Sequence, residues 1–334
     1  MRKFWKIILI ILSFIFLSIF CFFFVGKAQP KEEISWGVVF SQRHAKHLGP
    51  DWRKCYLAIL NELGVKNLKL VAYWDLIEKE PGIYDFSDLD WQIKEAKKRG
   101  AKILLVFGRR VPRWPECFIP KWALFPNDIH KERLLKFIEV LVNHYKNEDA
   151  IWAWQVENEP FFPFGKCPPP DEDLLKKEIE LVKSLDEKKR PVVITESGEL
   201  PLWFKAARLG DIVGHTLYRK VWISQLKMYF SYPFPPVYYA RKAWLVRKIF
   251  KKPVICVELQ AEPWGPVLLY DLPLEEQKKT MNLERFKKVI EYAKNTGEDT
   301  FYLWGAEWWY WLKEKHKDSQ IWEEAQKLFK SQVE

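Results

Sequence analysis

The most constraining feature of this sequence is a repeated alternation of short apolar runs with longer amphipathic stretches, which starts near residue 34 and continues along the chain. The apolar runs have the length of strands and are nearly continuous, which predicts a parallel sheet covered by helices on both faces. Eight such units without a dinucleotide-binding glycine motif favour closure into a (β/α)8 TIM barrel, an α/β fold. The predicted strands begin near Trp36, Leu68, Ala101, Ile151, Pro191, Asp211, Pro253 and Asp299.

The length of the chain fits one barrel. A rule of about 150 residues per domain would divide 334 residues into two domains, but single barrels commonly use the whole of this length. We expect helices at 51–63 and 87–99 that end at Gly64 and Gly100, because glycine accepts the left-handed backbone of a helix end. The fifth unit is the shortest, with a short helix expected at 200–209. We therefore predict one catalytic barrel domain over residues 28–334.

The N-terminal segment is different in kind, because residues 7–26 contain no charged residue. At about 1.5 Å per residue this segment matches the thickness of a hydrocarbon core of about 30 Å. We therefore predict that residues 1–27 form a membrane anchor with one transmembrane helix. A cleaved signal peptide is the alternative, since Gly26 and Ala28 are small residues of the kind found at cleavage sites.

The charges around this segment set its direction. Arg2, Lys3 and Lys6 precede the apolar run, which predicts a cytoplasmic N-terminus and a barrel outside the cytoplasm. We thus expect a membrane-anchored protein, or a secreted one if the segment is cleaved. The first 27 residues hold four of the 54 basic residues and no acidic residue, so the remainder carries 50 basic and 44 acidic residues. These charges are interleaved along predicted helices, which indicates solvated surfaces and no nucleic-acid partner.

Cysteine and histidine give weak signals. The five cysteines are too few for a scaffold built on disulfides. Cys117 and Cys167 follow the third and fourth predicted strands, so a disulfide between these loops is plausible, with two separate thiols as the alternative. The six histidines show no zinc-ligand spacing, and we expect neither a metal nor another cofactor.

Carboxylates end two of the predicted strands. The fourth strand runs into Glu157-Asn158-Glu159-Pro160, and the seventh delivers Glu258. The ends of parallel barrel strands meet at one rim, and strands four and seven lie on opposite sides of the barrel mouth. Two facing carboxyl groups are what glycoside hydrolysis requires, because one protonates the leaving oxygen while the other attacks the anomeric carbon or activates water.

Three segments give the sequence a recognisable likeness. They are W-Q-V-E-N-E-P at 154–160, W-D-L-I-E-K-E-P-G-I-Y-D-F-S-D-L-D at 74–90 and K-P-V-I-C-V-E at 252–258. In these segments the chain resembles the glycoside hydrolase clan A superfamily, which includes β-galactosidase-like, β-xylosidase-like and cellulase-like members. The resemblance covers the chain from about residue 34 to about residue 326.

The resemblance implies specific roles at the two strand ends. Glu159 would be the general acid/base, Glu258 the nucleophile, and Asn158 a partner of the sugar 2-hydroxyl. This implies a retaining glycoside hydrolase that cleaves β-linkages of an extracytoplasmic oligo- or polysaccharide through a covalent glycosyl-enzyme. For Glu159 to act as an acid near neutral pH, we expect an apolar or anionic neighbourhood that raises its pKa.

Further residues are candidates for binding the carbohydrate. His215 and Tyr218 end the sixth strand, where clan members often place residues that orient the nucleophile. Trp304 ends the eighth strand and resembles the aromatic floor beneath the sugar at the cleavage point; indole faces suit the C–H face of a pyranose. Five tryptophans follow predicted strands and are candidates for further subsites, with packing into the core as the alternative: Trp74, Trp114, Trp264, Trp308 and Trp309.

The chain also departs from the clan pattern. Lys69 stands in the second strand where many members carry Arg, and Arg109 follows the third strand where cellulase-like members carry His. We count both among the candidate substrate-binding residues, although Lys lacks the bidentate fork of Arg. Glu196 and Glu262 are rival carboxylates. We rank Glu262 second as nucleophile because Ala261 and Pro263 suggest that the strand has already ended there.

Three other functions compete with hydrolysis. A transglycosidase would use the same two glutamates with a sugar as acceptor. A sugar-binding barrel without catalysis would keep the aromatic residues but has no need of the full set of Asn158, Glu159 and Glu258. A barrel enzyme of another class, such as a phosphate-binding isomerase, would need a glycine-rich loop after the seventh strand, where residues 260–265 are instead acidic and aromatic.

Overall fold

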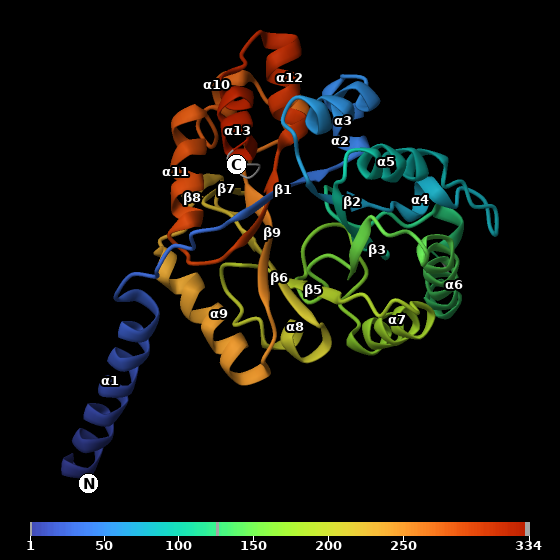
Figure 1. The fold of residues 1–334 in the computed structure, drawn as a ribbon. Coiled ribbons are helices and arrows are strands. Elements are labelled where there is room, and N and C mark those ends of the chain that lie inside the picture. Colours follow the sequence, from blue (N-terminus) through green and yellow to red (C-terminus); the bar gives the residue numbers. More distant parts are fainter. Residues whose placement is uncertain (1, 125–126, 331–334) are drawn as a thin grey trace.

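The computed structural model describes residues 2–124 and 127–330, and its centre is a closed barrel of eight parallel strands (Figure 1). The first strand pairs with the second on one side and with the last on the other, which closes the sheet. All eight begin within one residue of the positions expected from the sequence, so the predicted (β/α)8 barrel is confirmed. The barrel strands are β1 (Ser35–Phe40), β2 (Asn67–Val71), β3 (Lys102–Phe107), β4 (Ile151–Val156), β5 (Val192–Glu196), β6 (Ile212–Leu217), β9 (Val254–Gln260) and β10 (Thr300–Trp304).

The strands are apolar because both of their faces are buried. Side chains such as Val39, Leu104 and Val257 fill the interior of the barrel. Alternate side chains pack outward against the helices, as Leu105 and Cys256 do. This double burial explains why the strands appear in the sequence as continuous apolar runs without a polar face.

Helices surround the barrel, and polar side chains cap several of them. The Asp171 side chain accepts a hydrogen bond from the Leu174 backbone N–H at the start of α7. Gly64 and Gly100 have φ of 72° and 66°, as expected for residues that end helices. The short helix expected in the fifth unit is α8. The helices of the barrel layer are α2 (Gln42–Leu48), α3 (Trp52–Asn61), α4 (Trp74–Ile77), α5 (Ser87–Lys98), α6 (Asn127–Tyr145), α7 (Glu172–Leu185), α8 (Phe204–Leu209), α9 (Pro236–Phe250), α10 (Leu274–Gln277), α11 (Leu283–Lys294), α12 (Ala306–His316) and α13 (Gln320–Lys330).

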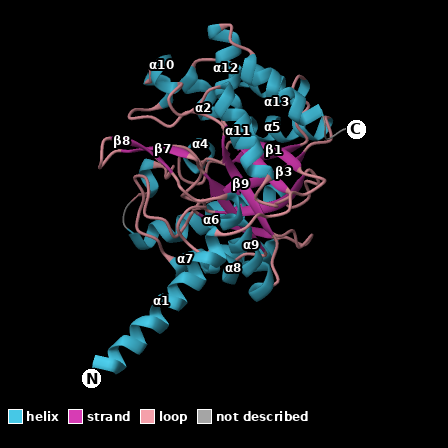
Figure 2. Ribbon diagram, turned by 90° about the vertical axis from the view of Figure 1, so that its left-hand side faces the viewer, coloured by secondary structure: helices cyan, strands magenta, loops and turns pink. Residues whose placement is uncertain are grey.

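Additions to the barrel gather in the segments that follow strands. An antiparallel hairpin of β7 (Lys220–Ile223) and β8 (Met228–Ser231) follows β6 and projects to one side of the molecule (Figure 2). The Gln260 side chain at the end of β9 accepts hydrogen bonds from the backbone N–H groups of Arg219 and Lys220, at 2.8 and 3.0 Å. Two short 3-10 helices, at Lys121–Ala123 and Leu269–Asp271, lie in the loops after β3 and β9. The two hydrogen bonds to Gln260 attach the start of the hairpin to the rim where the candidate catalytic residues lie.

The N-terminal helix α1 (Arg2–Phe24) extends away from the barrel (Figure 1). Its segment Phe4–Phe24 is long and apolar enough to cross a membrane, a criterion that signal sequences also meet. The end of α1 packs on α9, where the rings of Phe22 and Trp244 lie 5.8 Å apart and those of Phe24 and Tyr238 lie 5.5 Å apart. The predicted domains 1–27 and 28–334 include residues 1, 125–126 and 331–334, which lie outside the described residues.

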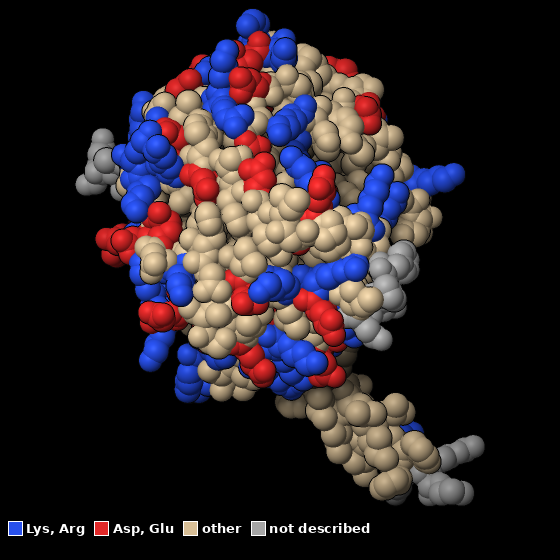
Figure 3. All heavy atoms as spheres, turned by 90° about the vertical axis from the view of Figure 1, so that its right-hand side faces the viewer, with Lys and Arg blue, Asp and Glu red and all other residues tan. Residues whose placement is uncertain are grey.

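Charged side chains are mixed over the surface. On the face shown in Figure 3, Lys and Arg alternate with Asp and Glu, while α1 extends from the body as an apolar arm. The loops after β3 and β4 are joined by the Cys117–Cys167 disulfide, so the disulfide considered in the sequence analysis is present. This bond links two loops that both contribute residues to the rim.

Candidate active site

A cavity of about 860 Å³ lies at the C-terminal ends of the barrel strands, and both candidate catalytic glutamates line it. Glu159 approaches from the end of β4 and Glu258 from β9. Six of the ten candidate residues line this cavity. Lys69 does not line it but donates a hydrogen bond to Glu258, which does. The six are Asn158, Glu159, Tyr218, Glu258, Trp264 and Trp304.

The backbone after β4 directs Glu159 into the cavity. Glu157 and Glu159 have φ of 59° and 45°, so the chain turns sharply where the strand ends. The Glu159 backbone N–H donates to the Thr195 hydroxyl oxygen at 2.7 Å, and the Asn158 N–H donates to the Arg110 carbonyl at 2.7 Å. These bonds attach the turn to both neighbouring strand ends, which fixes the direction of the Glu159 side chain.

Glu159 lies in surroundings that favour its protonated form. Burial, followed by the nearby carboxylates of Glu258 and Glu199, raises the pKa of Glu159 to about 8. The Thr216 hydroxyl donates to Glu159 Oε1 at 3.1 Å and opposes this shift only in part. A carboxyl group with this pKa holds a proton at neutral pH, as a general acid requires.

Glu258 lies in surroundings of the opposite kind. The buried Lys69 ammonium donates to its Oε1 at 2.8 Å, and the Tyr218 hydroxyl donates to its Oε2 at 3.1 Å. Burial and the Glu258 carboxylate raise the pKa of Tyr218 well above its usual value, so the phenol keeps the proton that it donates. Both oxygens of Glu258 are therefore hydrogen-bonded, one of them to a cation, and bonds of that kind are the strong ones.

Asn158 links the two sides of the cavity floor. Its Oδ1 accepts hydrogen bonds from Lys69 Nζ at 3.4 Å and from Gln155 Nε2 at 2.9 Å. Its side chain also lies close enough to Glu116, a residue of the loop after β3, to lower the pKa of that carboxyl group.

Aromatic rings form the walls. Trp304 ends β10, and its Nε1 donates to Glu262 at 2.8 Å. The Trp264 ring meets the Tyr218 ring edge to face at 5.3 Å. Trp114, another tryptophan that the sequence analysis considered for a subsite, lines the cavity and has 44% of its surface exposed. Rings at a carbohydrate-sized cavity offer apolar faces for sugar C–H groups.

Glu262, the rival nucleophile, is bound into an ionic network. Its carboxylate pairs with Arg113 and with His44 Nε2, the latter at 3.2 Å. Arg113 also pairs with Glu307 at 3.3 Å. Burial alone would raise the pKa of Glu262, but Arg113 and His44 hold it down to about 2. Glu262 lies beyond the end of β9, as expected, and its oxygens face cations and the indole N–H of Trp304.

His215 does not reach the cavity, which corrects one prediction. It is fully buried, and its Nε2 lies 2.8 Å from a carboxylate oxygen of Glu298. Its ring stacks on Trp203 at 4.4 Å on the outer side of the barrel. The register between β6 and β9 shifts between His215 and Thr216, and Thr216 is the residue that faces Glu159.

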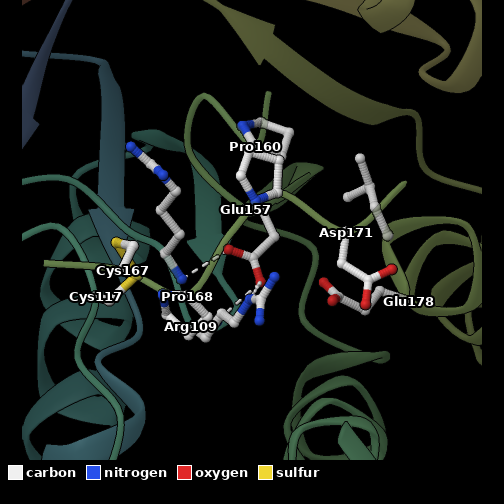
Figure 4. Close-up of a pocket in the computed structure, with 11 residues that line it drawn as sticks. Arg109, Cys117, Glu157, Pro160, Cys167, Pro168, Asp171 and Glu178 are labelled. Atoms are coloured by element: carbon white, nitrogen blue, oxygen red, sulfur yellow. Dashed lines mark hydrogen bonds and ion pairs between the residues drawn. A yellow bond between two sulfur atoms is a disulfide. The ribbon is translucent and has the colours of Figure 1, made fainter. Parts of the chain in front are cut away.

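Trp74 and Arg109 also lie outside the large cavity. Trp74 begins α4, donates to Glu78 Oε2 at 2.7 Å and stacks on Phe137, so it belongs to the layer between barrel and helices. Arg109 lines a separate cavity of about 10 Å³, the volume of one water molecule, beside Glu157 (Figure 4). Neither residue therefore lines the predicted substrate cavity, and contact of either with substrate stays a prediction.

Sequence reasoning missed several cavity residues. Thr216, Glu199, Glu116 and Arg113 line the cavity, and they come from a strand interior or from loops with no motif. Only Glu116 had a signal: an acidic residue next to Cys117 in a long loop after a strand. Among the described residues, no group of three or more His, Cys, Asp and Glu side chains is arranged to hold a metal ion.

Comparison with known proteins agrees with this geometry. No family model matches the chain. A stretch of 115 residues is 29% identical to the probable mannan endo-1,4-β-mannosidase A of Aspergillus clavatus and covers 30% of each protein. A stretch of 155 residues is 26% identical to the β-galactosidase of Xanthomonas manihotis and covers 41% of this chain and 25% of that protein.

Solved structures agree on the fold. The exo-β-1,4-mannosidase of Opitutaceae bacterium strain TAV5 superposes with a TM-score of 0.57 over 84% of this chain and 53% of that one, at 15% identity. The chain thus matches about half or less of the length of these proteins. The chain is thus similar in sequence to a mannosidase and a β-galactosidase over part of its length, and it shares the barrel fold of an exo-β-1,4-mannosidase.

Proposed function

We propose that this protein is a retaining glycoside hydrolase that cleaves β-linkages of an extracytoplasmic glycan and is held at the membrane by α1. One observation carries the proposal: two carboxyl groups line one cavity in opposite surroundings. Glu159 has neighbours that favour a proton, and Glu258 has an ammonium and a phenol as donors. An acid and a nucleophile of a retaining enzyme need this difference.

The first chemical step forms a covalent intermediate. A Glu258 oxygen attacks the anomeric carbon while Glu159 gives its proton to the leaving oxygen, so that the glycosidic bond breaks as the ester forms. Lys69 and Tyr218 hold the attacking carboxylate in place until it becomes part of a neutral ester.

The second step releases the sugar. Glu159, now ionised, takes a proton from water, and the water oxygen attacks the anomeric carbon as the bond to Glu258 breaks. Two inversions retain the anomeric configuration. The mechanism requires carboxyl groups about 5 to 5.5 Å apart, against roughly 6.5 to 9.5 Å for inversion.

Azide rescue tests the proposal on the full chain in detergent. The wild type should release 4-methylumbelliferone from at least one member of a β-glycoside panel, with a retained product by NMR. Glu258→Ala and Glu159→Ala should both lose activity. Azide should then give the α-glycosyl azide from Glu258→Ala and the β-glycosyl azide from Glu159→Ala. In each variant azide occupies the space left by the missing carboxyl group and attacks the anomeric carbon from that side.

Two results would overturn this assignment. Glycan binding by the wild type with no turnover across the panel would indicate a sugar-binding barrel. Product appearing only when a second sugar is added as acceptor would indicate a transglycosidase that uses the same residues.

A further inference from the structure

A third carboxyl group enters the cavity beside the catalytic pair. Glu116 belongs to the loop after β3 and lines the same cavity as Glu159 and Glu258. Its backbone has φ of 73°, its N–H donates to the Arg113 carbonyl at 2.7 Å, and its carbonyl accepts from the Val111 N–H at 2.9 Å. Glu116 is therefore held in a defined position and does not lie on a loose loop.

The neighbouring loop packs closely on Glu116. Gly165 has φ of 82°, and a side-chain carbon at this position would come within 2.7 Å of Glu116 Cβ and 2.6 Å of the Pro115 carbonyl oxygen. The disulfide between Cys117 and Cys167 joins the two loops immediately beside this contact. Side-chain freedom at Glu116 is thus restricted from two sides.

Glu116 lies next to the reacting centre on the Asn158 side. The Asn158 side chain lines the same cavity as Glu116, lowers the pKa of Glu116 and is linked to Glu258 through Lys69. In a pyranose, carbon 2 is the ring carbon bonded to the anomeric carbon, and it carries a hydroxyl or an amino group. A substrate whose anomeric carbon lies between Glu159 and Glu258 therefore presents its carbon 2 substituent within reach of the Asn158 and Glu116 pair.

The third carboxyl group has a cation nearby but no direct ion pair. Within the described part of the chain, Lys69 pairs with Glu258, Arg113 pairs with Glu262 and Glu307, and no ion pair involves Glu116. Burial, followed by the charges of Glu258 and Glu159, raises the pKa of Glu116 well above its usual value, and the charge of Arg110 opposes this shift only in part. The cavity wall thus holds a carboxyl group that lacks a direct ion-pair partner.

We propose that Glu116 binds the ammonium group of an amino sugar, so that the substrate class is β-linked 2-amino-2-deoxyhexosides with a free amine. This inference rests on the proposed function. An ammonium at carbon 2 favours the ionised form of Glu116 and donates to its carboxylate as a direct ion-pair partner, whereas a hydroxyl brings no charge. An N-acetyl group removes the charge and adds bulk at the point where Asn158 and Glu116 meet.

The test compares three aryl β-glycosides that differ only at carbon 2: the glucosaminide, the N-acetylglucosaminide and the glucoside, with the galacto series in parallel. The full chain should favour the free amine over both others by about 10- to 100-fold in kcat/KM, the scale of a charge-assisted hydrogen bond. Glu116→Gln should reduce this preference to within about threefold, and Glu116→Asp should keep part of it.

A matched control is Glu187→Gln, which removes a carboxylate whose side chain is 88% exposed and should leave the preference unchanged. Inhibition of the wild type by glucosamine, N-acetylglucosamine and glucose gives a second measurement that needs no variant, and glucosamine should inhibit most strongly. Turnover of neutral hexosides with no preference for the amine in the wild type would overturn this inference alone. No turnover of any glycoside would overturn the proposed function together with it.

Discussion

Two carboxylates at the same cavity, Glu159 and Glu262, differ in almost every respect except that burial raises the pKa of both. Glu159 has one hydroxyl donor and two carboxylate neighbours, and its pKa rises to about 8. Glu262 has Arg113, His44 and the Trp304 indole as partners, and its pKa falls to about 2. The difference shows that partners, more than burial, decide which carboxyl group can carry a proton at neutral pH.

The comparison also distinguishes Glu159, a candidate catalytic residue, from Glu262, which has a structural role. Glu262 fastens the loop after β9 to Arg113 in the loop after β3, and Arg113 lies with its guanidinium carbon 3.9 Å from the centre of the Trp304 ring. This ionic network of Arg113, Glu262, Glu307 and His44 builds the cavity wall. The pair Glu159 and Glu258 is left with the groups that a reaction needs.

The largest expected effect separates the two glutamates of β9 and its loop. Glu258→Gln should lower kcat/KM by about 10⁵-fold or more, because it removes the nucleophile, a loss of about 7 kcal/mol in transition-state stabilisation. Glu262→Gln should cost less than about 100-fold, since it only loosens the wall around Trp304. Steady-state kinetics on the best β-glycoside checks both.

If Glu262→Gln lost as much activity as Glu258→Gln, and azide restored it with an inverted product, Glu262 would be the nucleophile and Glu258 the structural residue. Unchanged secondary structure by circular dichroism is the condition for comparing these variants.

The second effect concerns stability. Arg113→Met leaves Glu262 and Glu307 without their cation in a buried place, and should lower the free energy of unfolding by about 3 to 5 kcal/mol. Arg53→Met, which removes the exposed pair with Asp88, should cost about 1 kcal/mol or less. Guanidinium unfolding at pH 7 measures both variants against the wild type.

The sign of the pH dependence follows from the lowered pKa of Glu262. The stability that Glu262 contributes is fully present above a pH of about 4.5 and is lost as the pH falls toward about 2. The gap between wild type and Arg113→Met should therefore narrow as the medium is acidified through this window. A gap independent of pH would show that Arg113 acts through packing on Trp304.

The position of the candidate catalytic pair was predictable because it depends on local sequence. Each glutamate ends a strand-length apolar run, and the barrel brings such ends to one rim whatever the loops do. Glu159, Glu258 and Asn158 therefore line the cavity as the sequence suggested.

The missed and misplaced residues depend on details that no local pattern encodes. Alternation along β6 puts His215 on the outer face with Val213 and Leu217 and puts Thr216 on the cavity face, and packing decides which face is which. Trp74 is removed from the rim by α4, which turns it toward Phe137, a residue of a later helix. The network of Glu262 and Arg113 joins loops 149 residues apart in the sequence. Such pairings are settled by packing between distant segments.

The third effect is the pH profile of catalysis. Because Glu159 must hold its proton to protonate the leaving group, kcat/KM should fall about tenfold per pH unit above its pKa of about 8. A dinitrophenyl glycoside, whose leaving group needs no proton, should show no such fall. A midpoint near 4.5 with aryl glycosides would mean that the surroundings of Glu159 do not raise its pKa when substrate is absent.

The smallest effect concerns the Thr216 hydroxyl, which also accepts a hydrogen bond from the Gly198 backbone N–H at 3.1 Å. Thr216→Val removes the hydroxyl that donates to Glu159 Oε1, a bond that favours the ionised form and so lowers the pKa. The midpoint of the alkaline fall should rise by about half a unit to one unit, since a hydrogen bond contributes about 1 kcal/mol and one unit corresponds to about 1.4 kcal/mol. A series of kcat/KM measurements between pH 6 and 10 resolves such a shift.

Thr195→Val is the matched control for this shift. The Thr195 hydroxyl accepts a hydrogen bond from the Glu159 backbone N–H and is not a partner of the Glu159 carboxyl group. Its loss should weaken the turn after β4 while leaving the alkaline midpoint in place. If both valine variants moved the midpoint alike, the proton on Glu159 would depend on the position of the turn, and the contrast with Glu262 would rest on geometry more than on partners.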